Sequence, residues 1–159
     1  MNVEFVLVRI DDRLIHGQVA IGWVKAVSPT VLIVANDAVA ADPLQRSLME
    51  MAAPPTLKVD LVTVDELPAL LERRDMQGQR VLLLLASPRD ALRVVEAGVP
   101  IGRVNVGGLR FQPGKRQVLR AVSLDDQDAA CLRSLLDHRI RVFVQMVPTD
   151  DPLPIEDVL

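Results

Sequence analysis

Short apolar runs alternate with helical patterns along this chain, and that alternation restricts the possible folds more than any other feature. The runs are short enough to be strands buried on both faces of a sheet. Strands that alternate with helices at this spacing form βαβ units, whose strands are parallel. The sequence therefore predicts an α/β fold, an open and mostly parallel twisted β-sheet with helices on both faces. The predicted strands are residues 5–8, 31–35, 57–64, 81–85, 103–106 and 140–144, with one or two short strands at 118–122.

Capping residues indicate where the helices between these strands begin. Asp and Ser accept hydrogen bonds from the first free amides of a helix, and Pro fits the first helical position. Leu44, Leu48 and Met51 fall on one face of the second helix. The chain after Pro148 is rich in proline and is predicted to be a loop with a frayed turn. Helices are predicted from about Gly17, after Asp42-Pro43, after Asp65, after Ser87-Pro88, and after Asp125 or Asp126.

Length and hydropathy fit one domain spanning residues 1–159. Half of the residues are hydrophobic, but charge and proline interrupt every apolar run well before the roughly 20 residues that cross a bilayer. The N-terminus has an acidic residue and a predicted strand where a signal peptide would have basic and apolar regions. We therefore expect a cytoplasmic protein.

The charge and cysteine content narrow the partners further. A formal charge of −3 and a pI near 5.4 argue against non-specific nucleic-acid binding, which needs a basic surface. Cys131 is the only cysteine, which excludes an internal disulfide and argues against a structural zinc site. Its apolar neighbours indicate a thiol in the core. No metal and no cofactor is predicted.

Residues 9–19 hold the most reactive group of side chains, because two acids, a cation and an imidazole stand between a predicted strand and a predicted helix. In open parallel sheets, ligands bind beyond the carboxyl ends of the strands, at a topological switch point. Residues 11–17, 36–37, Ser87 and 107–108 all follow predicted strands, and they are expected to converge at that edge.

His16 is the leading catalytic candidate, since a neutral imidazole is nucleophilic near pH 7 and can accept a phosphoryl group. It precedes a helix N-terminus, where free amides favour an anion, and Arg13 would bind the phosphoryl oxygens. The alternatives are a helix-start histidine bound to a carbonyl, and a simple salt bridge from Arg13 to Asp11 or Asp12. Asp12 is expected either to orient Arg13, to hydrogen-bond His16, or to cap the turn. His138, at a helix C-terminus, is expected to oppose the helix dipole.

Four further residues could support an anion at the same edge. The Ser87 hydroxyl could bind one, although a plain helix cap explains it equally well. Gly107 and Gly108 allow close approach of a ligand or loop, or serve only a turn. Gly17 starts the helix after His16.

Two other phosphate-related sites fit the sequence less well. Five residues separate Gly108 from Gly114, and Lys115 is followed by Arg116, so the P-loop spacing and its Ser or Thr are missing. Asp11-Asp12 also suggests a magnesium-dependent receiver domain, but the third strand provides no acceptor aspartate and the fifth lacks the usual lysine.

The whole set of motifs resembles the enzyme IIB component of the mannose/fructose/sorbose family of the bacterial phosphotransferase system. The first block is long and specific, and the others follow in family order over nearly the whole chain. The blocks are Arg9-Ile-Asp-Asp-Arg-Leu-Ile-His-Gly-Gln-Val19, Asn36-Asp-Ala-Val-Ala40 with Asp42, Met51-Ala-Ala-Pro54, Asn105-Val-Gly-Gly108, Gly114-Lys-Arg-Gln-Val118 and Ala121-Val-Ser123.

The resemblance implies that His16 accepts a phosphoryl group on Nδ1 from a phosphohistidine of the IIA component. It would then pass the group to a sugar imported by the membrane IIC and IID components, without a metal or nucleotide. Arg13 would be the phosphate-binding arginine, and the sheet would have about seven strands. The protein would associate with the inner face of the membrane through the permease. Leu109 and Arg110 depart from the family pattern, and Arg110 adds a cation near the phosphate edge.

Chemistry of this kind predicts an exposed imidazole within an apolar docking surface, to which Trp23 either belongs or contributes only from the core. The alternative function is a regulatory or binding domain of the same fold that senses phosphorylation without delivering phosphate to sugar. The sequence does not identify the sugar.

Overall fold

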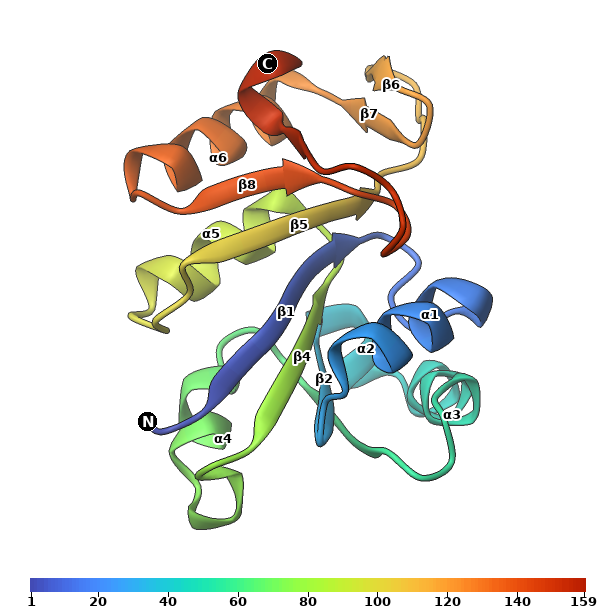
Figure 1. The fold of residues 1–159 in the computed structure, drawn as a ribbon, viewed down its shortest axis with the longest axis vertical. Helices are drawn as coiled ribbons and strands as arrows, with labels where there is room; N and C mark the ends of the chain where they lie inside the picture. The colour runs from blue at the N-terminus through green and yellow to red at the C-terminus, as the bar shows by residue number, and fades with distance from the viewer.

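A seven-stranded sheet forms the centre of the molecule in the computed structural model, with strand order β3-β2-β4-β1-β5-β8-β9 (Figure 1). The structure describes residues 1–159, apart from the side chains of Gln18 and Val19, so the predicted place of Val19 on an apolar helix face lies outside the described residues. The strands are parallel except β9, which confirms the predicted α/β fold. The strands are β1 (Glu4–Asp11), β2 (Val31–Ala35), β3 (Lys58–Val62), β4 (Arg80–Leu85), β5 (Arg103–Gly108), β8 (Arg141–Val144) and β9 (Leu153–Pro154), with β6 (Arg116–Leu119) and β7 (Val122–Leu124) in a separate hairpin.

Alternating side chains of the strands build a hydrophobic core on each face of the sheet. On β4, Val81, Leu83 and Leu85 pack into the larger core, whereas Leu82 and Leu84 point into the smaller one. Helices α4, α5 and α6 cover the first face, and α1 and α2 cover the second. The helices are α1 (Gly17–Val27), α2 (Asp37–Ala41), α3 (Pro43–Ala52), α4 (Leu67–Glu72), α5 (Pro88–Glu96) and α6 (Asp126–Asp137).

The connections after β1 and β5 leave the sheet in opposite directions. The chain runs from β1 through α1 to β2 on one side, and from β5 through α6 to β8 on the other, with the two helices on opposite faces (Figure 1). A crevice opens at such a switch point, outside the carboxyl ends of the strands. The ends of β1 and β5 meet there, because Asp11 is paired with Gly108.

Several helix starts agree with the capping residues predicted from the sequence. Asp42 caps α3, Ser87 caps α5 and Asp125 caps α6, each through its side chain. The short helix α2 was not predicted, and α4 begins at Leu67 rather than directly after an Asp65 cap.

A reciprocal pair of hydrogen bonds joins Thr63 and Glu66 in the turn just before α4. The amide of Thr63 donates to the Glu66 carboxylate at 2.9 Å, and the amide of Glu66 donates to the Thr63 hydroxyl at 3.1 Å. No side-chain cap bond is described at Glu66, the residue before the helix, and the Asp65 carboxylate accepts from Arg93 at 2.9 Å, so the predicted Asp65 cap is wrong.

Helix α3 presents its predicted apolar face to solvent. Leu44, Leu48 and Met51 are 68, 51 and 81 % exposed, so their helical spacing does not mark a buried face. Within the described residues, no helix combines the length and the apolar character needed to cross a membrane.

Residues 148–152 form the predicted loop, but a strand and a 3-10 turn follow from Leu153, which corrects the prediction of a frayed end. Strand β9 pairs antiparallel with β8, and the side chain of Ile155 is fully buried in the larger core. Proline is tolerated in an edge strand, where its missing N–H is not needed by a neighbour. The proline content therefore indicated the edge of the sheet rather than disorder.

We predict that Ile155→Ala lowers the free energy of unfolding by about 2–5 kcal/mol, because it empties a filled site in the core. Ile21→Ala is the matched control, since Ile21 is 59 % exposed. Urea denaturation measures both variants. Equal, small losses would contradict the buried role of the C-terminal segment.

Candidate functional site

The end of β1 turns two charged side chains toward the same face of the sheet. Side chains alternate along a strand, so Arg9 and Asp11 share the face on which α1 packs, while Ile10 enters the opposite core. Both charged side chains are buried, with Asp11 completely inaccessible. A buried charge must be compensated by partners, and the surroundings of Asp11 provide them.

Asp11 accepts hydrogen bonds from the two functional candidates. The Arg13 guanidinium donates from Nε to Oδ1 and from Nη2 to Oδ2, both at 3.1 Å, and the Arg13 amide also reaches Oδ1 at 3.1 Å. Nε2 of His16 lies 3.3 Å from Oδ2 of the same carboxylate. One side chain therefore holds both the arginine and the imidazole.

His16 occupies the position just before helix α1. Its backbone is extended, with φ −152° and ψ 147°, and among the described groups its side chain makes no capping bond. The free amides and the positive end of the helix dipole favour an anion beside this side chain. The side chain is 22 % exposed, so a partner can reach it from solvent.

The contact with Asp11 favours one tautomer of a neutral His16. A neutral imidazole that donates from Nε2 to a carboxylate carries its lone pair on Nδ1. In this tautomer the free lone pair is on Nδ1, the atom to which the family resemblance assigns the phosphoryl group.

Asp11 remains ionised although it is buried. Burial favours the neutral acid, but hydrogen bonds from the Arg13 side chain and amide, together with the charges of Arg9 and Arg13, outweigh it and lower the pKa of Asp11 below its usual value. The site therefore keeps a full negative charge available for Arg13 and His16 at neutral pH.

Two of the three roles predicted for Asp12, orienting Arg13 and bonding His16, belong to Asp11 instead. Asp12 points away from Asp11, and its Oδ2 accepts from the amide of Arg110 at 2.9 Å and from the Arg110 guanidinium at 3.3 Å. The Asp12 amide donates to the carbonyl of Gly108 at 3.0 Å. Asp12 therefore fastens the loop after β5 to the loop after β1, and Arg110 is held in this contact.

The predicted glycines lie at the site in different ways. A side chain on Gly107 would collide with the guanidinium of Arg9, and one on Gly108 would stand 3.3 Å from Nη2 of Arg13. The close approach that the glycine pair allows is therefore made by two arginines of the chain itself. Gly17 is exposed and begins α1, and a β-carbon at this position would meet no described atom within 4 Å.

Ser87 and His138 have local structural contacts. The Ser87 hydroxyl accepts the amide of Asp90 at 3.1 Å as the cap of α5, and no contact among the described residues joins it to His16. Nδ1 of His138 lies 2.8 Å from the carbonyl of Ser134 at the end of α6, as its predicted helix-end position suggests.

Arg9 is the component of the site to which the sequence prediction gave no role. It is 1 % exposed and donates to Asp11 at 3.2 Å and to Asn105 at 2.6 Å. The available signal was a charged residue inside an apolar strand, two positions before an aspartate that shares its face.

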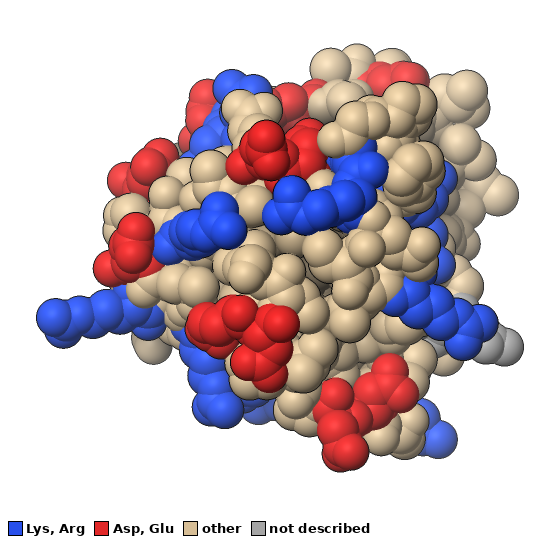
Figure 2. All heavy atoms as spheres, turned by 90° about the horizontal axis from the view of Figure 1, so that it is seen from above, with Lys and Arg blue, Asp and Glu red and all other residues tan. Residues whose placement is uncertain are grey.

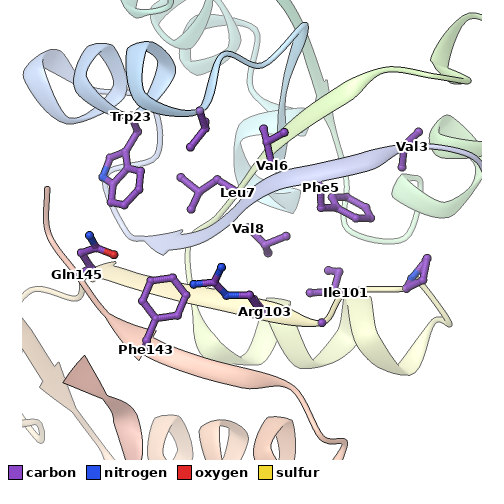
Figure 3. A pocket seen from close by; sticks show the side chains of 13 residues that line it. Val3, Phe5, Val6, Leu7, Val8, Trp23, Ile101, Arg103, Phe143 and Gln145 are labelled. Atoms are coloured by element: carbon purple, nitrogen blue, oxygen red, sulfur yellow. The ribbon is translucent and has the colours of Figure 1, made fainter. Parts of the chain in front are cut away.

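Trp23 belongs to the core rather than to a docking surface. It is 6 % exposed, and its indole N–H donates to the carbonyl of Met146 at 3.0 Å. Trp23 and Gln145 lie at one end of a groove of about 430 Å³, with Val3 and Ile101 toward the other end (Figure 3).

A second hollow of about 310 Å³ lies directly beside Arg13. It includes Arg110, Phe111, Arg120 and Met146 on the loops after β5, β6 and β8. On the face drawn in Figure 2, acidic and basic side chains occur in small separate groups between uncharged surface. Among the described residues, no group of three or more His, Cys, Asp or Glu side chains is placed to hold a metal ion.

One ionised carboxylate holds an imidazole and an arginine at the switch point of a parallel sheet. These features define a class of α/β protein whose site can bind an anionic group. Comparison with known proteins gives the family. A profile described as "PTS system sorbose subfamily IIB component" matches residues 5–159. The chain belongs to this family of phosphotransferase-system components, as its sequence motifs predicted.

Individual relatives agree with this assignment. The chain is 38 % identical over 155 residues to the sorbose-specific EIIB component of Klebsiella pneumoniae, covering 98 % of this chain and 94 % of that protein. The crystal structure of the IIBSor domain of the Klebsiella pneumoniae sorbose permease superposes with a TM-score of 0.93 at 38 % identity, over 99 % of this chain and 95 % of that one.

A longer relative is the mannose-specific EIIAB component of Escherichia coli (strain K12). It is 42 % identical over 153 residues, which cover 96 % of this chain. The chain spans about half of that relative's length, since the match covers 47 % of it.

We predict that Asp11→Asn lowers the free energy of unfolding by about 3 kcal/mol near pH 7, because Arg9 and Arg13 lose their buried carboxylate partner. The pKa of Asp11 is lowered in the folded protein. The carboxylate therefore contributes fully above its unfolded pKa of about 3.9, and the contribution is lost as the pH falls through the folded value. Urea denaturation of both proteins from pH 7 to pH 3 measures the difference, and a pH-independent difference would contradict an ionised Asp11.

Proposed function

We propose that His16 accepts a phosphoryl group from a phosphorylated IIA component and passes it to a sugar presented by the membrane IIC and IID components. The observation that carries this proposal is the contact of Asp11 with both Nε2 of His16 and the Arg13 guanidinium. A neutral imidazole that donates from Nε2 to Asp11 has its lone pair on Nδ1, and the same carboxylate binds the Arg13 guanidinium. Membership of the IIB family supports the same role.

The first step forms a bond between Nδ1 of His16 and the phosphorus atom. The nitrogen–phosphorus bond of the donor phosphohistidine breaks, and its electron pair returns to the donor imidazole. Arg13 and the amides at the start of α1 bind the equatorial oxygens, whose charge must be spread during transfer. Asp11 stabilises the positive ring that forms as Nδ1 becomes bonded.

The second step transfers the same group to a sugar hydroxyl. The hydroxyl oxygen bonds to phosphorus, its proton is released, and the bond from phosphorus to Nδ1 breaks, which restores the neutral imidazole. The protein would work in the cytoplasm, at the inner face of the membrane where the permease presents the sugar.

We predict that His16→Ala abolishes acceptance of phosphate, because the methyl side chain of alanine provides no nucleophile. The experiment incubates the chain with labelled phosphoenolpyruvate, the general phosphotransferase proteins and a cognate IIA component. His138→Ala is the matched control, since His138 lies at the end of α6, and it should accept phosphate normally.

Addition of IIC and IID with sugar then tests delivery. Label that leaves His16 and appears on the sugar supports the proposed carrier function. Label that stays on the protein would indicate a regulatory domain, and label on an aspartate in the presence of magnesium would indicate a receiver-like activity.

We also propose that the IIA component docks on an apolar surface around His16, made of Ile21, Phe111, Met146 and Val147. These side chains are exposed. They lie in the first turns of α1 and in the loops after β5 and β8, at the same edge of the sheet as His16. A surface of this kind suits a site that must meet a histidine on another protein.

We predict that Phe111→Ser raises the concentration of phosphorylated IIA needed for half-maximal transfer by about tenfold, since it removes a large apolar contact. Met51→Ser is the matched control, because Met51 is also an exposed large apolar residue but lies at the end of α3, away from the carboxyl edge of the sheet. The rate of labelling of His16 at varied IIA concentration measures both. An identical response of the two variants would contradict this docking surface.

A further inference from the structure

We propose that Arg9 is a positioning residue for phosphoryl transfer, whose buried positive charge keeps Asp11 directed at Arg13 and opposes protonation of His16. The proposal rests on the proposed function, because a protonated imidazole has no lone pair for phosphorus. Arg9 itself does not reach solvent and would touch neither donor nor acceptor.

The contacts of Arg9 come from three separate segments of the chain. Nη1 donates to the side chain of Asn105 on β5 at 2.6 Å and to the carbonyl of Gln145 at 3.0 Å. Nη2 donates to Asp11 at 3.2 Å and to the carbonyl of Met146 at 3.0 Å. The guanidinium is therefore fixed by β1, β5 and the turn after β8.

Trp23 and Gly107 enclose the Arg9 guanidinium. The ring of Trp23 lies 5.3 Å from its Cζ atom, and the same indole donates to the Met146 carbonyl that Arg9 binds. The backbone of Gly107 lies so close that any β-carbon would overlap the guanidinium. The Arg9 guanidinium can therefore occupy this position only because residue 107 is a glycine.

These contacts are not fully explained by packing. Nε of Arg9 is buried without a hydrogen-bond partner in the described part of the chain, and burial lowers the pKa of Arg9 despite the neighbouring carboxylate. A neutral side chain of the same length would avoid this desolvation. We therefore assign the role of Arg9 in the site to its positive charge.

The charges around His16 indicate the effect of the positive charge of Arg9. With a neutral imidazole, Arg9, Asp11 and Arg13 sum to one positive charge. Without Arg9 the sum is zero, and the Asp11 carboxylate attracts a proton to His16 more strongly. The positive sum also favours a phosphoryl group, which carries negative charge.

Most other charged groups on the surrounding elements are paired or distant, and Arg120, which lines the hollow beside Arg13, is exposed to solvent. Asp12 and Arg110 bind each other, Asp37 on α2 binds Arg93, and Asp150 after β8 accepts the amide of Val147. On α1 the first turn has no acid, and Lys25 stands in the last turn. Arg9 is therefore the buried cation next to Asp11 that a single substitution can remove while Arg13 stays in place.

The test follows the ring signals of both histidines by NMR during a pH titration of the unphosphorylated chain. We expect Arg9→Met to raise the titration midpoint of His16 by about one pH unit, the size of effect that one nearby charge produces. Arg9→Lys keeps the charge and should leave the midpoint near that of the parent. His138 is an internal reference whose midpoint should not move in either variant.

A purely structural role for Arg9 would not move this midpoint. Arg46→Met is the matched control, because Arg46 is also partly buried and donates to the carbonyls of Ala40 and Leu61, on elements that do not carry His16. A folded Arg9→Met protein whose His16 midpoint equals those of the parent and the Arg46 variant would overturn the proposal.

Asn105 supplies a second test if Arg9→Met does not fold. Asn105→Asp places a carboxylate beside Arg9 and cancels its charge, so it should raise the His16 midpoint relative to Asn105→Ala. Equal midpoints in these two variants would also overturn the proposal.

Phosphate acceptance measured over the same pH range links the result to function. In Arg9→Met the acidic limb of the rate profile should move upward with the NMR midpoint. A parent chain that titrates as expected but never accepts phosphate would refute the proposed function alone, since the NMR measurement needs no phosphoryl donor.

Discussion

The buried carboxylate of Asp11 is the interaction on which the rest of the site depends. It is fully inaccessible, yet it stays ionised because cationic and amide donors surround it. Its two oxygens fix the plane of Arg13 and one nitrogen of His16. A buried charge is unfavourable unless its partners are in place. The site therefore assembles as the protein folds.

The topology explains why such a carboxylate can stand beside a reachable imidazole. Strand β1 lies in the middle of the sheet between β4 and β5, so Asp11 at its end is covered by neighbours. The next residues leave the sheet at the switch point, and His16 emerges within five positions at the start of α1. The outcome is a partly exposed imidazole next to a fully buried carboxylate, an arrangement that fits the proposed transfer between proteins.

Much of this arrangement was predictable because it is encoded locally. The strands β2 and β4 are almost uniformly apolar, and Asp42, Ser87 and Asp125 cap helices as expected from their residue types. His16 was selected from its position between strand and helix, and the family motifs agreed.

The predictions from sequence were wrong where a shift of one residue in register, or a partner far away in the sequence, determines the structure. Asp11 and Asp12 are adjacent acids, and only the exact end of β1 determines which of them faces inward. The burial of Ile155 depends on pairing of β9 with β8, which no local pattern near the C-terminus indicates. Arg9 finds its acceptors at residues 105, 145 and 146, far away in sequence.

The same remote contacts explain why an arginine, and not a lysine, fits position 9. A lysine ammonium is a compact point charge with three donors, whereas the planar guanidinium spreads its donors over a fork. That fork reaches the Asn105 side chain and the Gln145 carbonyl from one nitrogen, and Asp11 and the Met146 carbonyl from the other. A lysine could supply the charge but could not join all of these acceptors at once. Charge and shape therefore contribute separately at this position, the charge to the state of the imidazole and the shape to holding β1, β5 and the turn after β8 together.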